Sequence, residues 1–151
     1  MSVAIALHLL AAVIWVGGMF FGYVCLRPAL GTLEPPARMR ILRGTMQNFL
    51  AWVSISIIVL LLTGYWAVSA SYAGFAGLPM HINIMQGTGW VMILMFGHLY
   101  FAVWPKMRRA VDNEDWEEAV RRHSTIKRII EINLTLGIVT VLIASSGRFW
   151  G

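Results

Sequence analysis

Four histidines are the residues of this sequence best suited to bind a metal ion or a heme iron: His8, His81, His98 and His123. A histidine inside a bilayer is rare and needs a partner, and His8 lies in the uncharged stretch of residues 1–26. His123 lies in a charged segment, where a solvated side chain is expected. We therefore look for chemistry at the other three.

A comparison of depth in the membrane separates these histidines into two sets. With the helical rise of about 1.5 Å per residue, His8 lies roughly 10 Å to the outer side of the midplane and His98 roughly 6 Å to the inner side. One iron or copper ion cannot easily join residues so far apart in height. The outer set is His8, His81 and Met85, with Tyr65 and Trp66 at a similar depth.

The outer set suits two cofactors. Imidazole is a usual axial ligand of b-type heme, and glycines in apolar helices leave room for the macrocycle. Imidazole and thioether together also suit Cu(I). We predict that His8 and His81 are metal ligands, with heme b as the preferred cofactor and copper as the alternative.

The inner set combines His98 with polar residues near the start of the last apolar stretch. Asn133 lies at a comparable depth and Glu131 about 3 Å closer to the cytoplasm, with Arg128 nearby. Because an acid inside the membrane is costly unless it is paired, we expect these side chains to cluster. The cluster could be a proton relay, a second ligand set or an interhelical hydrogen-bond clamp.

The elements that must position these residues are membrane-spanning helices. Hydrophobic residues make up 58% of the chain, charged residues only 13%, and the mean hydropathy is +0.70. Each of four apolar stretches is long enough to cross a hydrocarbon core of about 30 Å. We predict an all-α, integral membrane four-helix bundle, a single domain over residues 1–151 with spans at approximately 3–26, 48–72, 82–104 and 127–147.

The distribution of positive charge predicts the orientation of this bundle. All Lys and Arg residues except Arg148 lie in two segments, residues 27–43 and 106–128. Short basic loops face the cytoplasm, so both termini are expected on the periplasmic side of a bacterial inner membrane. The net charge of +5 is then a topology signal, with membrane lipid as the partner and nucleic acid excluded.

Three short motifs resemble one group of small bacterial membrane proteins. The run His8-Leu9-Leu10-Ala11-Ala12-Val13-Ile14-Trp15-Val16-Gly17-Gly18-Met19 resembles the first helix of the CopD superfamily, which includes copper-resistance CopD domains and HemJ-type protoporphyrinogen oxidases. His81-Ile82-Asn83 is similar to the His-Ile-Lys of the HemJ group. Arg27-Pro28 and residues 128–148 are closer to an uncharacterised CopD-like branch. The resemblance implies a heme-binding bundle in which His8 is an axial ligand and the histidines of the third span are its partners.

Three functions are compatible with these observations. The preferred one is a heme protein acting in electron transfer or as a membrane oxidoreductase, with quinone or porphyrin as its partner. Asn83 replaces the lysine of the HemJ pattern, which argues against porphyrinogen oxidation itself. The second is a copper-handling protein that passes Cu(I) inward through His8, His81 and nearby methionines. The third is a scaffold subunit without a cofactor, and a homo-oligomer fits each of them.

Overall fold

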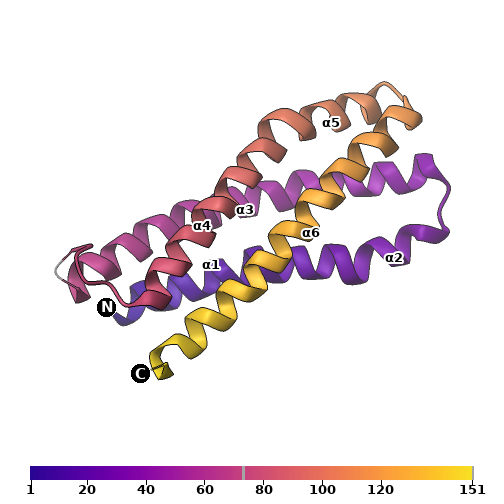
Figure 1. Cartoon of the computed structure of the whole chain (residues 1–151). Helices are drawn as coiled ribbons and strands as arrows, with labels where there is room; N and C mark the ends of the chain where they lie inside the picture. The colour runs from indigo at the N-terminus through magenta and orange to yellow at the C-terminus, as the bar shows by residue number, and fades with distance from the viewer. Residues whose placement is uncertain (73, 151) are drawn as a thin grey trace.

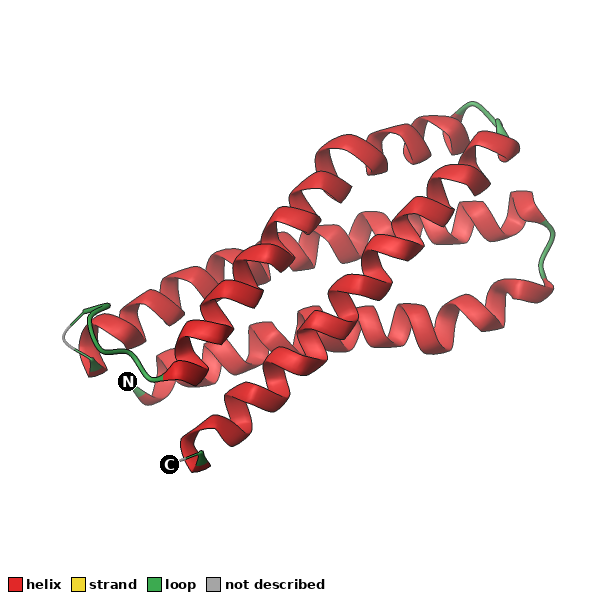
Figure 2. Cartoon of the chain, in the orientation of Figure 1, coloured by secondary structure: helices red, strands yellow, loops and turns green. Residues whose placement is uncertain are grey.

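The computed structural model describes residues 1–72 and 74–150, which form long helices joined by short loops (Figures 1 and 2). Four helical segments are long and apolar enough to cross a membrane: Ser2–Thr32, Pro35–Ser71, Met80–Asp112 and Trp116–Phe149. Both termini lie at one end of the bundle (Figure 1), which we call the terminal end. The predicted all-α fold with four spanning helices is confirmed.

The first and third segments are longer than predicted. The first consists of α1 (Ser2–Phe20), the π-helical η1 (Phe21–Leu26), α2 (Arg27–Ala29) and the 3₁₀ turn η2 (Leu30–Thr32). The third consists of α4 (Met80–His98), the π-helical η3 (Leu99–Val103) and α5 (Trp104–Asp112). Both helices continue through a proline, so the predicted spans 3–26 and 82–104 are the apolar parts of longer helices.

The two π-helical segments explain how these helices continue past a proline. A proline ring clashes with the carbonyl four residues before it and removes one helical hydrogen bond. For Pro28 that carbonyl belongs to Val24, and for Pro105 it belongs to Phe101. Val24 lies in η1 and Phe101 in η3, so each wider π turn is placed where the clash would otherwise occur.

The second and fourth segments extend beyond their apolar parts at the end opposite the termini, which we call the basic end. These are α3 (Pro35–Ser71) and α6 (Trp116–Ser146), the latter followed by η4 (Gly147–Phe149). The carboxylate of Asp115 caps α6 by accepting a hydrogen bond from the backbone N–H of Glu118, at 3.1 Å. Glu118 also pairs with Arg121 and Arg122. The predicted spans 48–72 and 127–147 are thus the apolar parts of longer helices.

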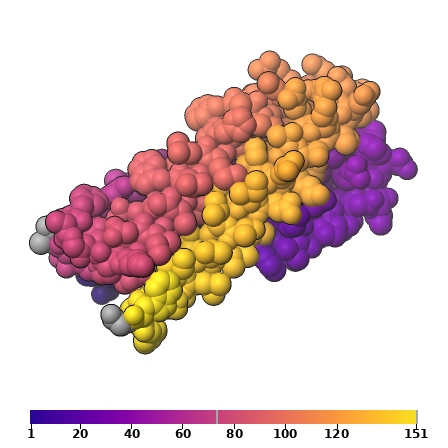
Figure 3. Space-filling view, viewed as in Figure 1, coloured from indigo at the N-terminus to yellow at the C-terminus, as the bar shows by residue number. Residues whose placement is uncertain are grey.

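The helices pack as two antiparallel pairs, α1 with α3 and α4 with α6. In the space-filling view, the second pair covers most of one face (Figure 3). One cluster of buried apolar side chains fills the basic end, around Met107 and Ile126, and another fills the middle, around Trp15, Val53 and Met92. These two clusters fix the helices against one another, while His8 lies closer to the terminal end.

Candidate functional site

His8 lies on α1 and faces α3. Its ring nitrogen Nδ1 is 2.9 Å from Oγ1 of Thr63, a residue that is only 9% exposed. Its Cε1 lies 3.1 Å from the position that a Cβ on Gly64 would occupy. The missing side chain of Gly64 therefore leaves the room in which the imidazole ring sits, and Thr63 holds the ring in place.

The hydrogen bonds of Thr63 favour one tautomer of His8. The hydroxyl of Thr63 donates its only proton to the carbonyl oxygen of Val59, at 2.6 Å. In the tautomer with the ring proton on Nδ1, the hydroxyl accepts from His8 and keeps this bond to Val59. In this tautomer the lone pair of Nε2 is available, and a histidine that binds a metal is commonly held in this way through its other ring N–H. This geometry suits one metal ligand at His8.

His81 lies in the first turn of α4 and packs against η4. A Cβ on Gly147 would collide with the side chain of His81, so this close approach requires a glycine. Met85, one turn further along α4, is half-buried. His81 therefore contacts η4, whereas His8 contacts α3.

The described residues contain no group of three His, Cys, Asp or Glu side chains close enough to hold one metal ion. This finding leaves open a pair of ligands, or a site that uses methionine. Pairing of His8 with His81 or with Met85 stays a prediction.

The two aromatic residues expected near the outer set have different surroundings. The indole N–H of Trp90 donates to the hydroxyl of Tyr65 at 2.9 Å, which links α4 to α3. Trp66 is 63% exposed on the outside of the bundle. Tyr65 therefore serves the packing of the terminal half, and Trp66 faces away from it.

The structure separates Asn133 from the charged members of the inner set, while Arg128 and Glu131 line one surface depression. The side-chain amide of Asn133 is buried and donates to the backbone carbonyl of Met92 at 3.2 Å, whereas His98, Arg128 and Glu131 are exposed. Equal depth did not imply contact, because Asn133 lies about 200° around the helix from Glu131. Asn133 alone forms the interhelical clamp, without His98.

A second polar contact joins the same two helices. The hydroxyl of Thr140 donates to that of Thr88 at 2.7 Å, about two turns of α6 nearer the terminal end than Asn133. In lipid such contacts satisfy polar groups within the bundle, although the Oδ1 of Asn133 is buried without a partner among the described residues. The interface of α4 and α6 is thus held by two hydrogen bonds, and its polar residues are used for packing.

Comparison with known proteins adds the family. A family model described as copper resistance protein D, CopD, matches residues 43–146. The chain belongs to the CopD family. No curated protein and no solved structure gives a significant match. With its four spanning helices, this CopD-family chain is a multi-pass membrane protein.

The family match bears differently on the two proposed cofactors. Its description names copper resistance, so the copper alternative is better supported than the preferred heme b, and heme, iron and electron transfer receive no support from it. The matched range contains His81 and His98 but not α1, so the role of His8 in this CopD-family protein depends on geometry alone.

Two residues of the His8 surroundings were not linked to His8 from the sequence. Thr63 and Gly64 are adjacent on α3 and supply the hydrogen-bond acceptor and the space. A polar residue followed by a glycine, at about the depth of an intramembrane histidine on the preceding helix, is the signal that could have found them.

Proposed function

We propose that this CopD-family protein handles copper in the membrane and binds Cu(I) towards the terminal end of its bundle, with Nε2 of His8 as one ligand. The observation that carries the proposal is the hydrogen bond between Nδ1 of His8 and Thr63, which orients the ring and leaves Nε2 free. The family description supports copper as the substrate.

The second ligand is proposed to come from α4. Cu(I) is a soft ion that binds imidazole and thioether groups, and one pair of such ligands is enough to hold it. His81 and Met85 both lie in the first turns of α4, at the same end of the bundle as the start of α1 (Figure 1). A site of this kind needs no third histidine or carboxylate.

The packing of the middle of the bundle limits what this site does. Trp15, Met19 and Met92 are each 3 to 4% exposed and fill the space between the helices at that level. This filled middle favours capture and transfer of copper at the terminal end over a continuous pore. The proposal is therefore for reversible binding at one end of the protein.

A titration of the purified protein with Cu(I), in competition with a chromophoric Cu(I) chelator under reducing conditions, tests the proposal. We expect His8→Ala to weaken Cu(I) binding about tenfold or more, because a ligand is lost. His123→Ala removes a histidine from the basic end and should bind copper as the wild type does. Thermal unfolding of both variants without copper checks that each is folded.

Two results would contradict the proposal. Equal affinity of wild type and His8→Ala would remove His8 from the copper site. A Soret band in the purified protein that disappears in His8→Ala would assign the histidine to heme b instead, and the same absorption spectrum that monitors the titration detects it.

A further inference from the structure

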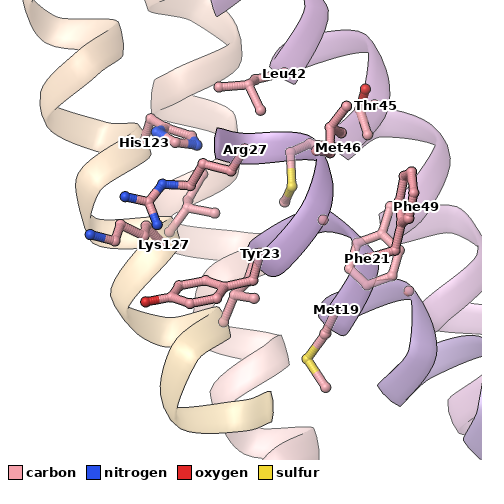
Figure 4. A pocket seen from close by; sticks show the side chains of 15 residues that line it. Met19, Phe21, Tyr23, Arg27, Leu42, Thr45, Met46, Phe49, His123 and Lys127 are labelled. Atoms are coloured by element: carbon pink, nitrogen blue, oxygen red, sulfur yellow. The ribbon is translucent and has the colours of Figure 1, made fainter. Parts of the chain in front are cut away.

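A pocket at the basic end combines an apolar wall with cationic side chains (Figure 4). It lies between η1, α3 and α6 and has a volume of about 170 Å³. Met46, Phe49 and Ile126 belong to its apolar lining, and Arg27, His123 and Lys127 to its polar side. In Figure 4 the side chains of Arg27 and Lys127 extend in the same direction, with His123 beside them.

The positive charge in this pocket has no counter-ion in the part of the chain that the structure describes. The ion pairs there use the carboxylates of Asp112, Glu114 and Glu118, which bind Arg40, Arg43, Arg121 and Arg122. Arg27 and Lys127 take part in none of them. Arg27 lies over the ring of Tyr23, 5.3 Å from its centre, which leaves its N–H donors available to an anion.

His123 responds to the same excess of positive charge. Burial and the nearby cations Arg27, Arg38 and Lys127 lower the pKa of His123 to about 4. The residue precedes the apolar stretch 129–146 and so lies outside the membrane-spanning part of α6. Its imidazole is therefore neutral at pH 7 and can still donate one hydrogen bond. An anion in the pocket would offset the repulsion among these groups.

We propose that this pocket binds an anionic phospholipid, with the lipid phosphate against Arg27, His123 and Lys127 and an acyl chain along the apolar wall. Basic pockets between spanning helices suit acidic headgroups. The apolar wall favours a lipid over a small soluble anion, and it continues to the ring of Phe21, which is 58% exposed on the outside of the bundle. The proposal does not depend on copper.

The site also requires space for the acyl chain of the lipid, and Gly22 provides it. Gly22 lines the pocket, and a Cβ built on it would meet no atom within 4 Å. It belongs to η1, and π-helical turns frequently occur at functional sites. The wider π turn of η1, which accommodates Pro28, thus also forms the part of the pocket wall that precedes Arg27.

Native mass spectrometry of delipidated protein, titrated with phosphatidylglycerol or with phosphatidylcholine of the same acyl chains, tests the site. We expect the wild type to prefer phosphatidylglycerol. The double variant Arg27→Gln/Lys127→Gln should lose about 30-fold in affinity for it, since each cation near a headgroup contributes about fivefold. The matched control Arg108→Gln/Arg109→Gln removes the same charge from exposed positions of α5 and should keep the preference.

A second variant tests the apolar part while every charge is kept. Gly22→Leu adds a side chain in the empty space and should weaken phosphatidylglycerol binding without removing a cation. Equal losses in the pocket and control double variants would show diffuse surface attraction and overturn the site. Displacement of the lipid by millimolar inorganic phosphate or glycerol phosphate would assign the pocket to a soluble anion and overturn the lipid.

Discussion

The hydroxyl of Thr63 limits what His8 can do. A histidine in lipid needs partners for both ring nitrogens, and Thr63 satisfies only Nδ1, through the 2.9 Å contact. Because this hydroxyl bonds the carbonyl of Val59 at 2.6 Å, it favours the tautomer with the proton on Nδ1 and orients the ring. The chemistry of His8 is thereby concentrated on Nε2.

The variant Thr63→Val tests whether the hydroxyl of Thr63 orients His8. Valine keeps the shape of threonine but removes the acceptor, so Nδ1 loses its partner and the ring is free to turn or to change tautomer. We expect Cu(I) affinity to fall about 10- to 100-fold, the usual effect of losing the group that orients a metal ligand. The measurement is the same chelator competition.

Thr140→Val is the matched control for this prediction. It removes the analogous hydroxyl from the contact between α4 and α6, where Thr140 donates to Thr88 at 2.7 Å. The two variants should unfold at similar temperatures, but only Thr63→Val should bind copper weakly. If both retain wild-type affinity, the Thr63 contact serves packing and does not prepare His8 as a ligand.

Between elements, one glycine sets how closely three helices meet. A Cβ on Gly137 of α6 would lie 2.9 Å from Cγ2 of Val16 on α1 and 3.2 Å from Cε of Met92 on α4. The methionine can move, but valine has few alternative rotamers. The close approach of α6 to α1 therefore depends on the absence of a side chain at this position.

Gly137→Ala is expected to destabilise the bundle by about 1–3 kcal/mol, the usual cost of overpacking. Gly97→Ala on α4 is the control, since a Cβ there meets no atom within 4 Å and alanine favours the helix. Unfolding in a mixed detergent series, followed by circular dichroism, measures both. If Gly137→Ala leaves the free energy of unfolding unchanged, α1 and α6 can move apart without loss of stability.

The same elements show what sequence could and could not predict. Apolar composition was enough to locate four spans, because lipid imposes their length. The continuation of the helices past Pro28 and Pro105 could not be predicted, since the π turns that admit a proline leave no hydrophobic signal. The expected contact of His98 with Asn133 did not form, because depth along a helix says nothing of direction around it.

Across the whole molecule, the ion pairs and the proposed copper site lie at opposite ends. The ion pairs Arg40–Glu114, at 3.1 Å, and Arg43–Asp112, at 2.8 Å, tie α3 to the end of α5 and to the turn that follows it at the basic end. His8 lies near the other end, where both termini are found (Figure 1). Which end faces the cytoplasm therefore determines from which side copper would reach His8.

Labelling of single cysteines with a membrane-impermeant maleimide tests the orientation. Cys25 is the only cysteine, so Cys25→Ser provides the background for Ser2→Cys at the terminal end and Asn113→Cys at the basic end. Because basic segments stay in the cytoplasm, Ser2→Cys should react in intact spheroplasts and Asn113→Cys only after the membrane is opened. That pattern would admit copper to His8 from outside the cell and place the phospholipid pocket in the inner leaflet. The reverse pattern would make the terminal end cytoplasmic, so His8 would instead receive copper from within the cell.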